Sequence, residues 1–75
     1  MKRYPEVSRN IIGAAKRAGY SVKALSDAVG IPYPTFNRRL SDPGSWRVCE
    51  LQAILRRIEL NNSEIEVLRK EVGIV

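Results

Sequence analysis

The side chains best able to make specific contacts lie together in the middle of the chain. If this stretch is helical, Phe36 and Leu40 fall one turn apart on one face. Asn37 and Arg38 then point away from that face, and we expect Tyr33, at the tip of the helix, to point away as well. An asparagine amide can pair with N6 and N7 of adenine, and an arginine guanidinium with O6 and N7 of guanine. These residue types at this spacing predict a polar, cationic helix that fits the major groove of DNA.

A sharp corner between two short helices would hold this helix in place. Residues 22–29 carry apolar side chains at helical spacing, and Ser21 before them is a favoured N-cap residue. We expect the chain to turn at Gly30, because a glycine adopts positive φ without a Cβ penalty. Pro34 disfavours α conformation at Tyr33, so we expect the second helix to begin at Pro34, with Tyr33 as its cap.

The rest of the chain also reads as short amphipathic helices. The apolar spacing predicts helices over residues 5–18, 22–29, 34–40, 48–58 and 63–72. Ser63 and Glu66 have the spacing of a capping box for the last of them. Trp46 follows a loop over residues 41–45 and is expected to cover the core. We therefore expect an all-α fold, with five short helices in a single domain over residues 1–75.

The positive charge of the chain is unevenly distributed. The 75 residues have a net charge of +5, from 13 Lys and Arg against 8 Asp and Glu. Residues 1–58 hold eleven basic and four acidic residues, which gives +7, and residues 59–75 hold two and four, which gives −2. A basic region attracts nucleic acids and anionic membrane surfaces alike. Charge alone therefore does not select the partner, and the helical pattern has to do so.

The sequence argues against several other classes of protein. No run approaches the ~18 consecutive apolar residues of a membrane span, and no apolar segment follows the basic residues of MKRYPEV, as a signal peptide requires. We therefore expect a cytoplasmic protein without a membrane partner. The single cysteine, Cys49, cannot form an internal disulfide, and the chain has no histidine and no glycine-rich phosphate loop. We expect no enzyme activity, no metal or other cofactor and no small-molecule substrate.

At the corner, the residues resemble the lambda repressor and Cro-like helix-turn-helix family, in particular the small regulators of phages and prophages. The matching positions are Leu25, Ser26, Val29, Gly30, Ile31 and Phe36. Ser26 stands where the family usually has alanine, and it is still small enough for two helices to cross closely. The resemblance implies a lambda repressor-like domain with the helix-turn-helix at helices 2 and 3. It also implies a sequence-specific DNA-binding transcriptional regulator of repressor or Cro type.

The resemblance further implies which side chains meet DNA. Base edges would be contacted from the start of the third helix, by Tyr33, Pro34, Asn37 and Arg38. Phosphates would be contacted by Ser21, Lys23, Arg39, Ser41 and Arg47. Each neutralised phosphate would add about −0.9 to the slope of log affinity against log salt concentration. For Arg38, a base contact and a phosphate contact are both open.

The last helix is the candidate surface for a protein partner. Relatives in this family bind as two-fold pairs on half-sites about 34 Å apart, so the resemblance implies a homodimer. Ile65, Leu68 and Val72, followed by Ile74 and Val75, give the last helix more apolar residues than a terminal segment needs. The same side chains could instead close the core of one chain. A second functional class is a protein-interaction module, such as an antitoxin or a regulatory adaptor, that binds its partner through this helix.

Overall fold

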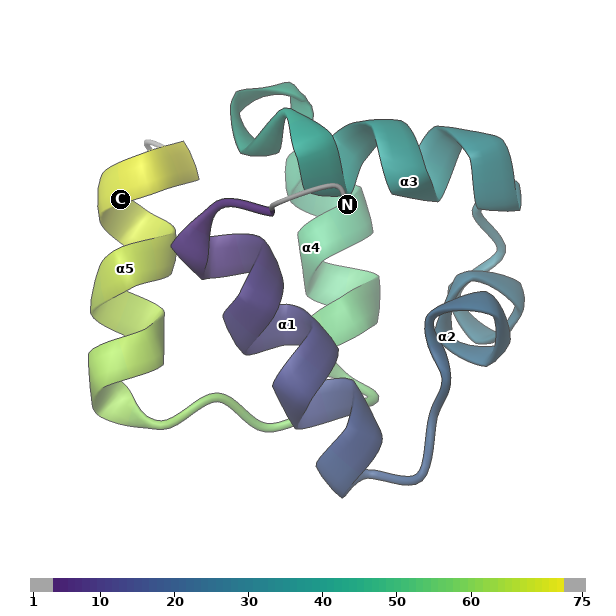
Figure 1. Ribbon diagram of the computed structural model, residues 1–75, viewed down its shortest axis with the longest axis horizontal. Coiled ribbons are helices and arrows are strands. Elements are labelled where there is room, and N and C mark those ends of the chain that lie inside the picture. Colours follow the sequence, from purple (N-terminus) through teal and green to yellow (C-terminus); the bar gives the residue numbers. More distant parts are fainter. Residues whose placement is uncertain (1–3, 73–75) are drawn as a thin grey trace.

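The computed structural model describes residues 4–72, and helices are the only regular secondary structure in this part of the chain (Figure 1). It contains five α-helices, α1 (Glu6–Arg17), α2 (Val22–Val29), α3 (Tyr33–Ser41), α4 (Val48–Leu55) and α5 (Asn62–Val72), and a short 3-10 turn, η1 (Pro43–Ser45). The predicted all-α class and the five helices are therefore confirmed. In Figure 1, α3 lies across the top, α5 packs against α1 on the left, and α2 lies on the right. Within residues 4–72, no helix is both long and apolar enough to cross a membrane.

Local sequence fixes both ends of α2. At its start, the Ser21 hydroxyl oxygen accepts a hydrogen bond of 3.0 Å from the Ala24 N–H. At its end, Gly30 has φ +76°, in the left-handed region. The N–H groups of Gly30 and Ile31 donate to carbonyls in the last turn of α2, which would otherwise lack partners. The structure confirms the predicted cap at Ser21 and the predicted turn at Gly30, and α1 ends in the same way at Gly19.

The start of α3 differs from the prediction. The helix begins at Tyr33, Pro32 is its N-cap residue, and Pro34 is its second residue. The Phe36 N–H donates to the Pro32 carbonyl over 2.9 Å, which closes the first turn around Tyr33 and Pro34. The prediction that Pro34 keeps Tyr33 out of the helix is therefore wrong. A proline in the first turn removes no intrahelical hydrogen bond, and here this outweighs its steric effect on the residue before it.

The fourth helix is shorter than predicted. α4 ends at Leu55 rather than at Ile58, and the N–H groups of Arg57 and Ile58 both donate to the Ile54 carbonyl. Ile58 still reaches the core and is only 4% exposed. The apolar spacing therefore predicts correctly that Ile58 is buried, although Ile58 lies in a turn after Leu55 and not in the helix.

The fifth helix begins with a different capping box. The Asn61 side-chain oxygen accepts a hydrogen bond from the Glu64 N–H, and the Glu64 carboxylate accepts one from the Asn61 N–H. The predicted box of Ser63 and Glu66 is therefore wrong by two residues. Asparagine caps a helix as well as serine does. In the observed register Glu64 also reaches Arg17 of α1, at 3.3 Å.

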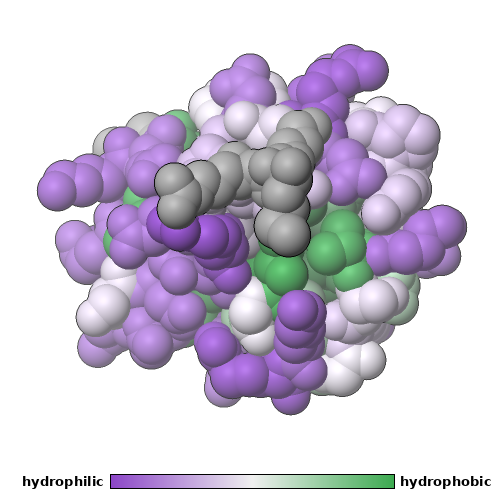
Figure 2. All heavy atoms as spheres, viewed as in Figure 1, coloured by the Kyte–Doolittle hydropathy of each residue, from purple (hydrophilic) through white to green (hydrophobic). Residues whose placement is uncertain are grey.

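The core is formed by residues of all five helices and their connections. Its buried apolar side chains are Val7, Ile11, Ala14, Ala15, Leu25, Ile31, Phe36, Leu40, Trp46, Leu51, Ile54, Ile58 and Leu68. Trp46 covers the core as predicted and packs edge-on against Phe36, with ring centroids 5.4 Å apart. The buried side of the helices is narrower than the apolar pattern predicts. Three residues that the pattern places on it are therefore exposed: Ala18, Val48 and Leu55. Figure 2 shows a mainly hydrophilic face with a small apolar area near its centre.

Candidate nucleic-acid interface

One side of α3 is free of the core and carries most of the predicted base-contacting groups. The other side is anchored by Phe36 and Leu40, which are 1% and 0% exposed. The free side carries the exposed Pro34 and Arg38, with the half-buried Asn37 at its edge. Tyr33 lies three residues before Phe36, on the anchored side of the helix, and is exposed because it is at the helix tip. The structure therefore brings the four residues together on one short helix.

Contacts with α2 fix the start of α3. Ser26 of α2 is fully buried, and its hydroxyl donates to the Lys23 carbonyl over 2.7 Å, inside α2. Its small side chain lets the two helices approach closely, and its polar group is satisfied without a partner on α3. Ile31, in the turn, is 8% exposed and belongs to the core. Both the turn and the helix crossing are therefore held by buried residues.

Contacts with the start of α1 fix the other end of α3. The buried Ser8 hydroxyl donates to the Leu40 carbonyl over 2.5 Å. This carbonyl lies in the last turn of α3, where it has no helical partner. The Tyr4 hydroxyl donates to Asn37 Oδ1 over 3.4 Å. Sequence reasoning misses Tyr4, since its one signal is its position directly before Pro5, the N-cap residue of α1.

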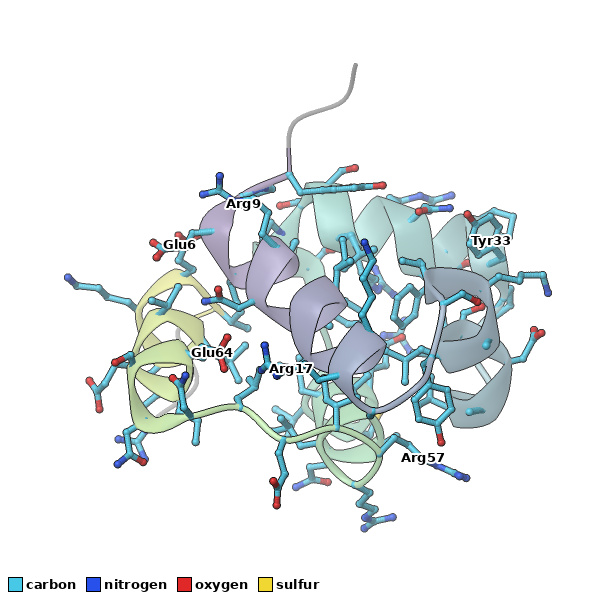
Figure 3. The ribbon with its side chains drawn as sticks, turned by 60° about the horizontal axis from the view of Figure 1, so that its bottom comes forward. Glu6, Arg9, Arg17, Tyr33, Arg57 and Glu64 are labelled. Atoms are coloured by element: carbon cyan, nitrogen blue, oxygen red, sulfur yellow. The ribbon has the colours of Figure 1, made fainter. Side chains whose placement is uncertain are left out.

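Lys23 lies between an acidic and an aromatic side chain. Its Nζ is 2.9 Å from Asp27 Oδ1, one turn along α2, and 5.9 Å from the centre of the Tyr33 ring. Figure 3 shows Tyr33 at the end of α3, beside α2. Both side chains of the ion pair are more than half exposed, and such pairs contribute only about 0.3–0.5 kcal/mol. A phosphate could therefore replace Asp27 as the partner of Lys23 at little cost.

Arg39 is not on the free side of α3. Its Nε donates to Glu50 Oε1 over 3.1 Å, and the side chains of this pair are only 16% and 13% exposed. The same Glu50 oxygen accepts a hydrogen bond of 2.9 Å from the Arg47 N–H, at the start of α4. Glu50 therefore ties α3 to α4. A phosphate contact by Arg39 would have to compete with this mostly buried ion pair.

The two predicted serine contacts are also used within the fold. The Ser21 oxygen accepts the cap hydrogen bond, and its hydroxyl proton remains able to donate to a phosphate. The Ser41 hydroxyl donates to the Asn37 carbonyl over 3.2 Å, so its proton is committed inside α3. The side chain of Arg47 is exposed. Among the predicted phosphate contacts, Ser21, Lys23 and Arg47 are therefore the best placed.

α5 has little apolar surface left for a partner. Leu68 is 6% exposed and belongs to the core, and Val72 packs against the core from a half-buried position. Ile65 is half-buried and lies apart from the core cluster. Ile74 and Val75 lie outside the described residues. Of the described candidates for a dimer contact, Ile65 is the one that the core does not use.

A groove of about 610 Å³ lies between the C-terminal ends of α1 and α4, away from α3. Arg17, Arg56 and Arg57 line it beside the exposed Leu55. Arg17 points toward α5, with which it forms an ion pair (Figure 3), and Arg57 donates to the Ala28 carbonyl over 3.4 Å. The arginines lie where helices end, and a cation stabilises the negative end of a helix dipole. Their charge is therefore explained by the fold.

Comparison of the chain with protein-family models, curated proteins and solved structures gave no match. Among residues 4–72, no cluster of three or more His, Cys, Asp or Glu side chains is arranged to hold a metal ion. Among the surfaces of residues 4–72, the free side of α3 combines exposed cationic and polar side chains on one rigidly held helix.

Proposed function

We propose that this chain is a sequence-specific double-stranded DNA-binding transcriptional regulator, with a lambda repressor-like helix-turn-helix formed by α2 and α3. The observation that carries the proposal is the free side of α3. Arg38 is exposed opposite the buried Leu40, Asn37 lies at the edge of the same side, and Tyr33 is exposed at the tip of the helix. In the major groove these groups would meet base edges. Such a regulator would act in the cytoplasm, without a cofactor.

Exposed groups at the starts of two other helices support contacts with the phosphate backbone. Ser21 and Lys23 lie at the start of α2, and the exposed Arg47 lies at the start of α4. The N-terminal ends of helices favour anions because their N–H groups are unpaired and the helix dipole is positive there. If Lys23, Arg38 and Arg47 each neutralise one phosphate, the slope of log affinity against log salt should be about −2.7 for each chain.

Selection of bound sites from random duplex DNA tests the proposal. We expect a palindromic consensus, because two chains related by a two-fold axis would place two α3 helices in successive major grooves. The affinity of the selected duplex should fall with salt as above. Failure to enrich any sequence, or an affinity that does not depend on salt, would refute DNA binding by this chain.

Substitution of Arg38 distinguishes its two possible roles. If Arg38 reads a base, Arg38→Ala should remove the preference at one position of the half-site and cost about 1–3 kcal/mol there. If it contacts a phosphate, the loss should be the same on every sequence, and the salt slope should fall by about 1. Arg56→Ala is the matched control, because Arg56 is an exposed arginine on the groove away from α3. The control should bind the selected site like the wild-type chain.

The proposed regulator would bind as a homodimer, and α5 remains the proposed contact. Removing α5 is not a usable test, because Leu68 belongs to the core and its loss would unfold the chain. Ile65→Glu changes a half-buried side chain apart from the core, so the monomer should stay folded. Light scattering should show a dimer for the wild-type chain and a monomer for this variant. A variant that still dimerises would remove α5 from the interface.

A protein-interaction module, such as an antitoxin or a regulatory adaptor, is the second candidate. The observation that favours it is on α4 rather than on α5: Val48 and Leu55, seven residues apart on this helix, are 54% and 41% exposed, so α4 has apolar surface that a protein partner could cover. Arg38→Glu separates the two functions. It should abolish DNA binding and leave the binding of a protein partner through α4 unchanged.

A further inference from the structure

We propose that Tyr4 is a positioning residue for Asn37 and presets its amide to read adenine. This inference rests on the proposed DNA-reading role of α3. The Tyr4 hydroxyl donates to Asn37 Oδ1 over 3.4 Å, and both side chains are half-buried at the edge of the free side of α3. The hydrogen bond therefore connects the segment before α1 to a side chain that would face a base.

Tyr4 can position another residue because the fold holds it in place. Its side chain packs against the core. Pro5 follows it with φ −57° and ψ 160°, and the proline ring restricts this φ. One turn further along α1, the buried Ser8 donates to the Leu40 carbonyl. The two hydrogen bonds, from Tyr4 to Asn37 and from Ser8 to Leu40, fix how the start of α1 lies along α3.

In the structure, Oδ1 is the end of the Asn37 amide that faces the Tyr4 hydroxyl. An amide oxygen has two lone pairs, so Oδ1 can accept from Tyr4 and still accept from a base, while Nδ2 donates. Adenine offers one donor, N6–H, and one acceptor, N7, which match this amide. Guanine offers two acceptors, O6 and N7, and an amide oxygen can donate to neither. An asparagine at this position should therefore prefer adenine, and Tyr4 would hold its amide ready for that contact.

Presetting also affects affinity. An unrestrained side chain loses rotational freedom when it binds, and this loss weakens binding. Because Tyr4 restricts Asn37 before DNA arrives, removal of the Tyr4 hydroxyl should weaken binding to the selected site by about three- to tenfold. The loss should appear only where Asn37 makes its base contact.

The test uses Tyr4→Phe, which removes only the hydroxyl. Tyr20→Phe is the matched control, because Tyr20 is another half-buried tyrosine packed against the core. Asn37→Ala first identifies the base pair that Asn37 reads, as the position whose preference disappears. Affinities are then measured for the selected duplex, for its three variants at that position and for an unrelated duplex. The salt slope and the melting temperature are measured alongside.

We expect adenine at the identified position, and a three- to tenfold loss for Tyr4→Phe on the selected duplex with weaker discrimination there. We expect no loss on unrelated DNA, none in the Asn37→Ala background and none for Tyr20→Phe. An equal loss on all duplexes, a loss that persists without Asn37, an unchanged affinity or a preference for guanine would each overturn the inference. If the wild-type chain enriches no site, the proposed function fails and this inference fails with it. If the wild-type chain binds a specific site and Tyr4→Phe leaves that affinity unchanged, the inference about Tyr4 is refuted and the proposed function is not.

Discussion

The ion pair between Arg39 and Glu50 gives a direct test of how α3 is held. Arg39 Nε and Glu50 Oε1 are 3.1 Å apart, and the two side chains are 16% and 13% exposed. Glu50→Gln keeps an oxygen that can accept the Arg47 N–H and removes the negative charge. Arg39→Met keeps most of the aliphatic stem and removes the guanidinium. These two changes therefore isolate the ion pair from the packing around it.

The expected magnitude follows from the exposure of the pair. Exposed ion pairs contribute about 0.2–1 kcal/mol, and loss of one partner from a fully buried pair costs about 3–5 kcal/mol. With roughly one seventh of each side chain exposed, this pair lies between those limits, and we expect Glu50→Gln to cost about 2 kcal/mol. For a chain of 75 residues, each loss of 1 kcal/mol in the free energy of unfolding lowers the melting temperature by about 6 °C. The melting temperature of the variant should therefore be about 12 °C lower.

A double-mutant cycle measured by circular dichroism checks the reasoning. The variants are Glu50→Gln, Arg39→Met and the double substitution, and we expect a coupling free energy of about 1–1.5 kcal/mol between the two sites. The coupling should largely survive in 1 M salt, where exposed pairs are screened. If the two single losses simply add, within about 0.3 kcal/mol, the side chains do not interact and the argument that Glu50 ties α3 to α4 is refuted. Arg39→Met should also leave the salt slope of DNA binding unchanged.

Two further pairs of substitutions test the turn and the buried serines by urea denaturation. Gly30→Ala would place a Cβ on a residue with φ +76° and should lower the free energy of unfolding by about 1–2 kcal/mol. Gly13→Ala lies inside α1, where a new Cβ meets no close contact, and should raise the free energy of unfolding by about 0.5–1 kcal/mol. Equal stabilities for these two variants would contradict the left-handed turn. Ser8→Ala should cost about 1–2 kcal/mol, because it leaves the buried Leu40 carbonyl without a partner. Ser26→Ala should change stability by less than about 0.5 kcal/mol, since its hydroxyl bonds only within α2, and a large loss there would show that the hydroxyl has a further role.

The corner between α2 and α3 was predictable from sequence because its signals are local. Ser21 accepts a hydrogen bond from a residue three positions away, and Gly30 takes a conformation that other residues adopt only with strain. The spacing of Phe36 and Leu40 also fixes the buried side of α3 without knowledge of its neighbours. Such features need only a few consecutive residues, so the sequence contains all the information.

The incorrect predictions concern places where more than one local arrangement fits the same sequence pattern. Asn61 with Glu64 and Ser63 with Glu66 have the same capping-box spacing, and a contact with Arg17, distant in sequence, accompanies the first of them. The burial of Ile58 from a turn likewise depends on where the rest of the core lies. These choices are decided by tertiary packing, which spacing does not report.

The same difference between local and tertiary contacts explains which polar residues of α3 remain free for the proposed contact with DNA. A nine-residue helix with a proline in its first turn is too short to be stable alone, so it must be held by its neighbours. The structure shows the holding groups: Arg39 bonds to α4, Ser41 bonds within α3, and the Leu40 carbonyl is bonded from α1. Arg39 and Ser41 are polar residues that sequence reasoning assigns to phosphates. Because they are engaged in the fold, recognition would fall to the side chains that the fold leaves free, with Arg38 foremost.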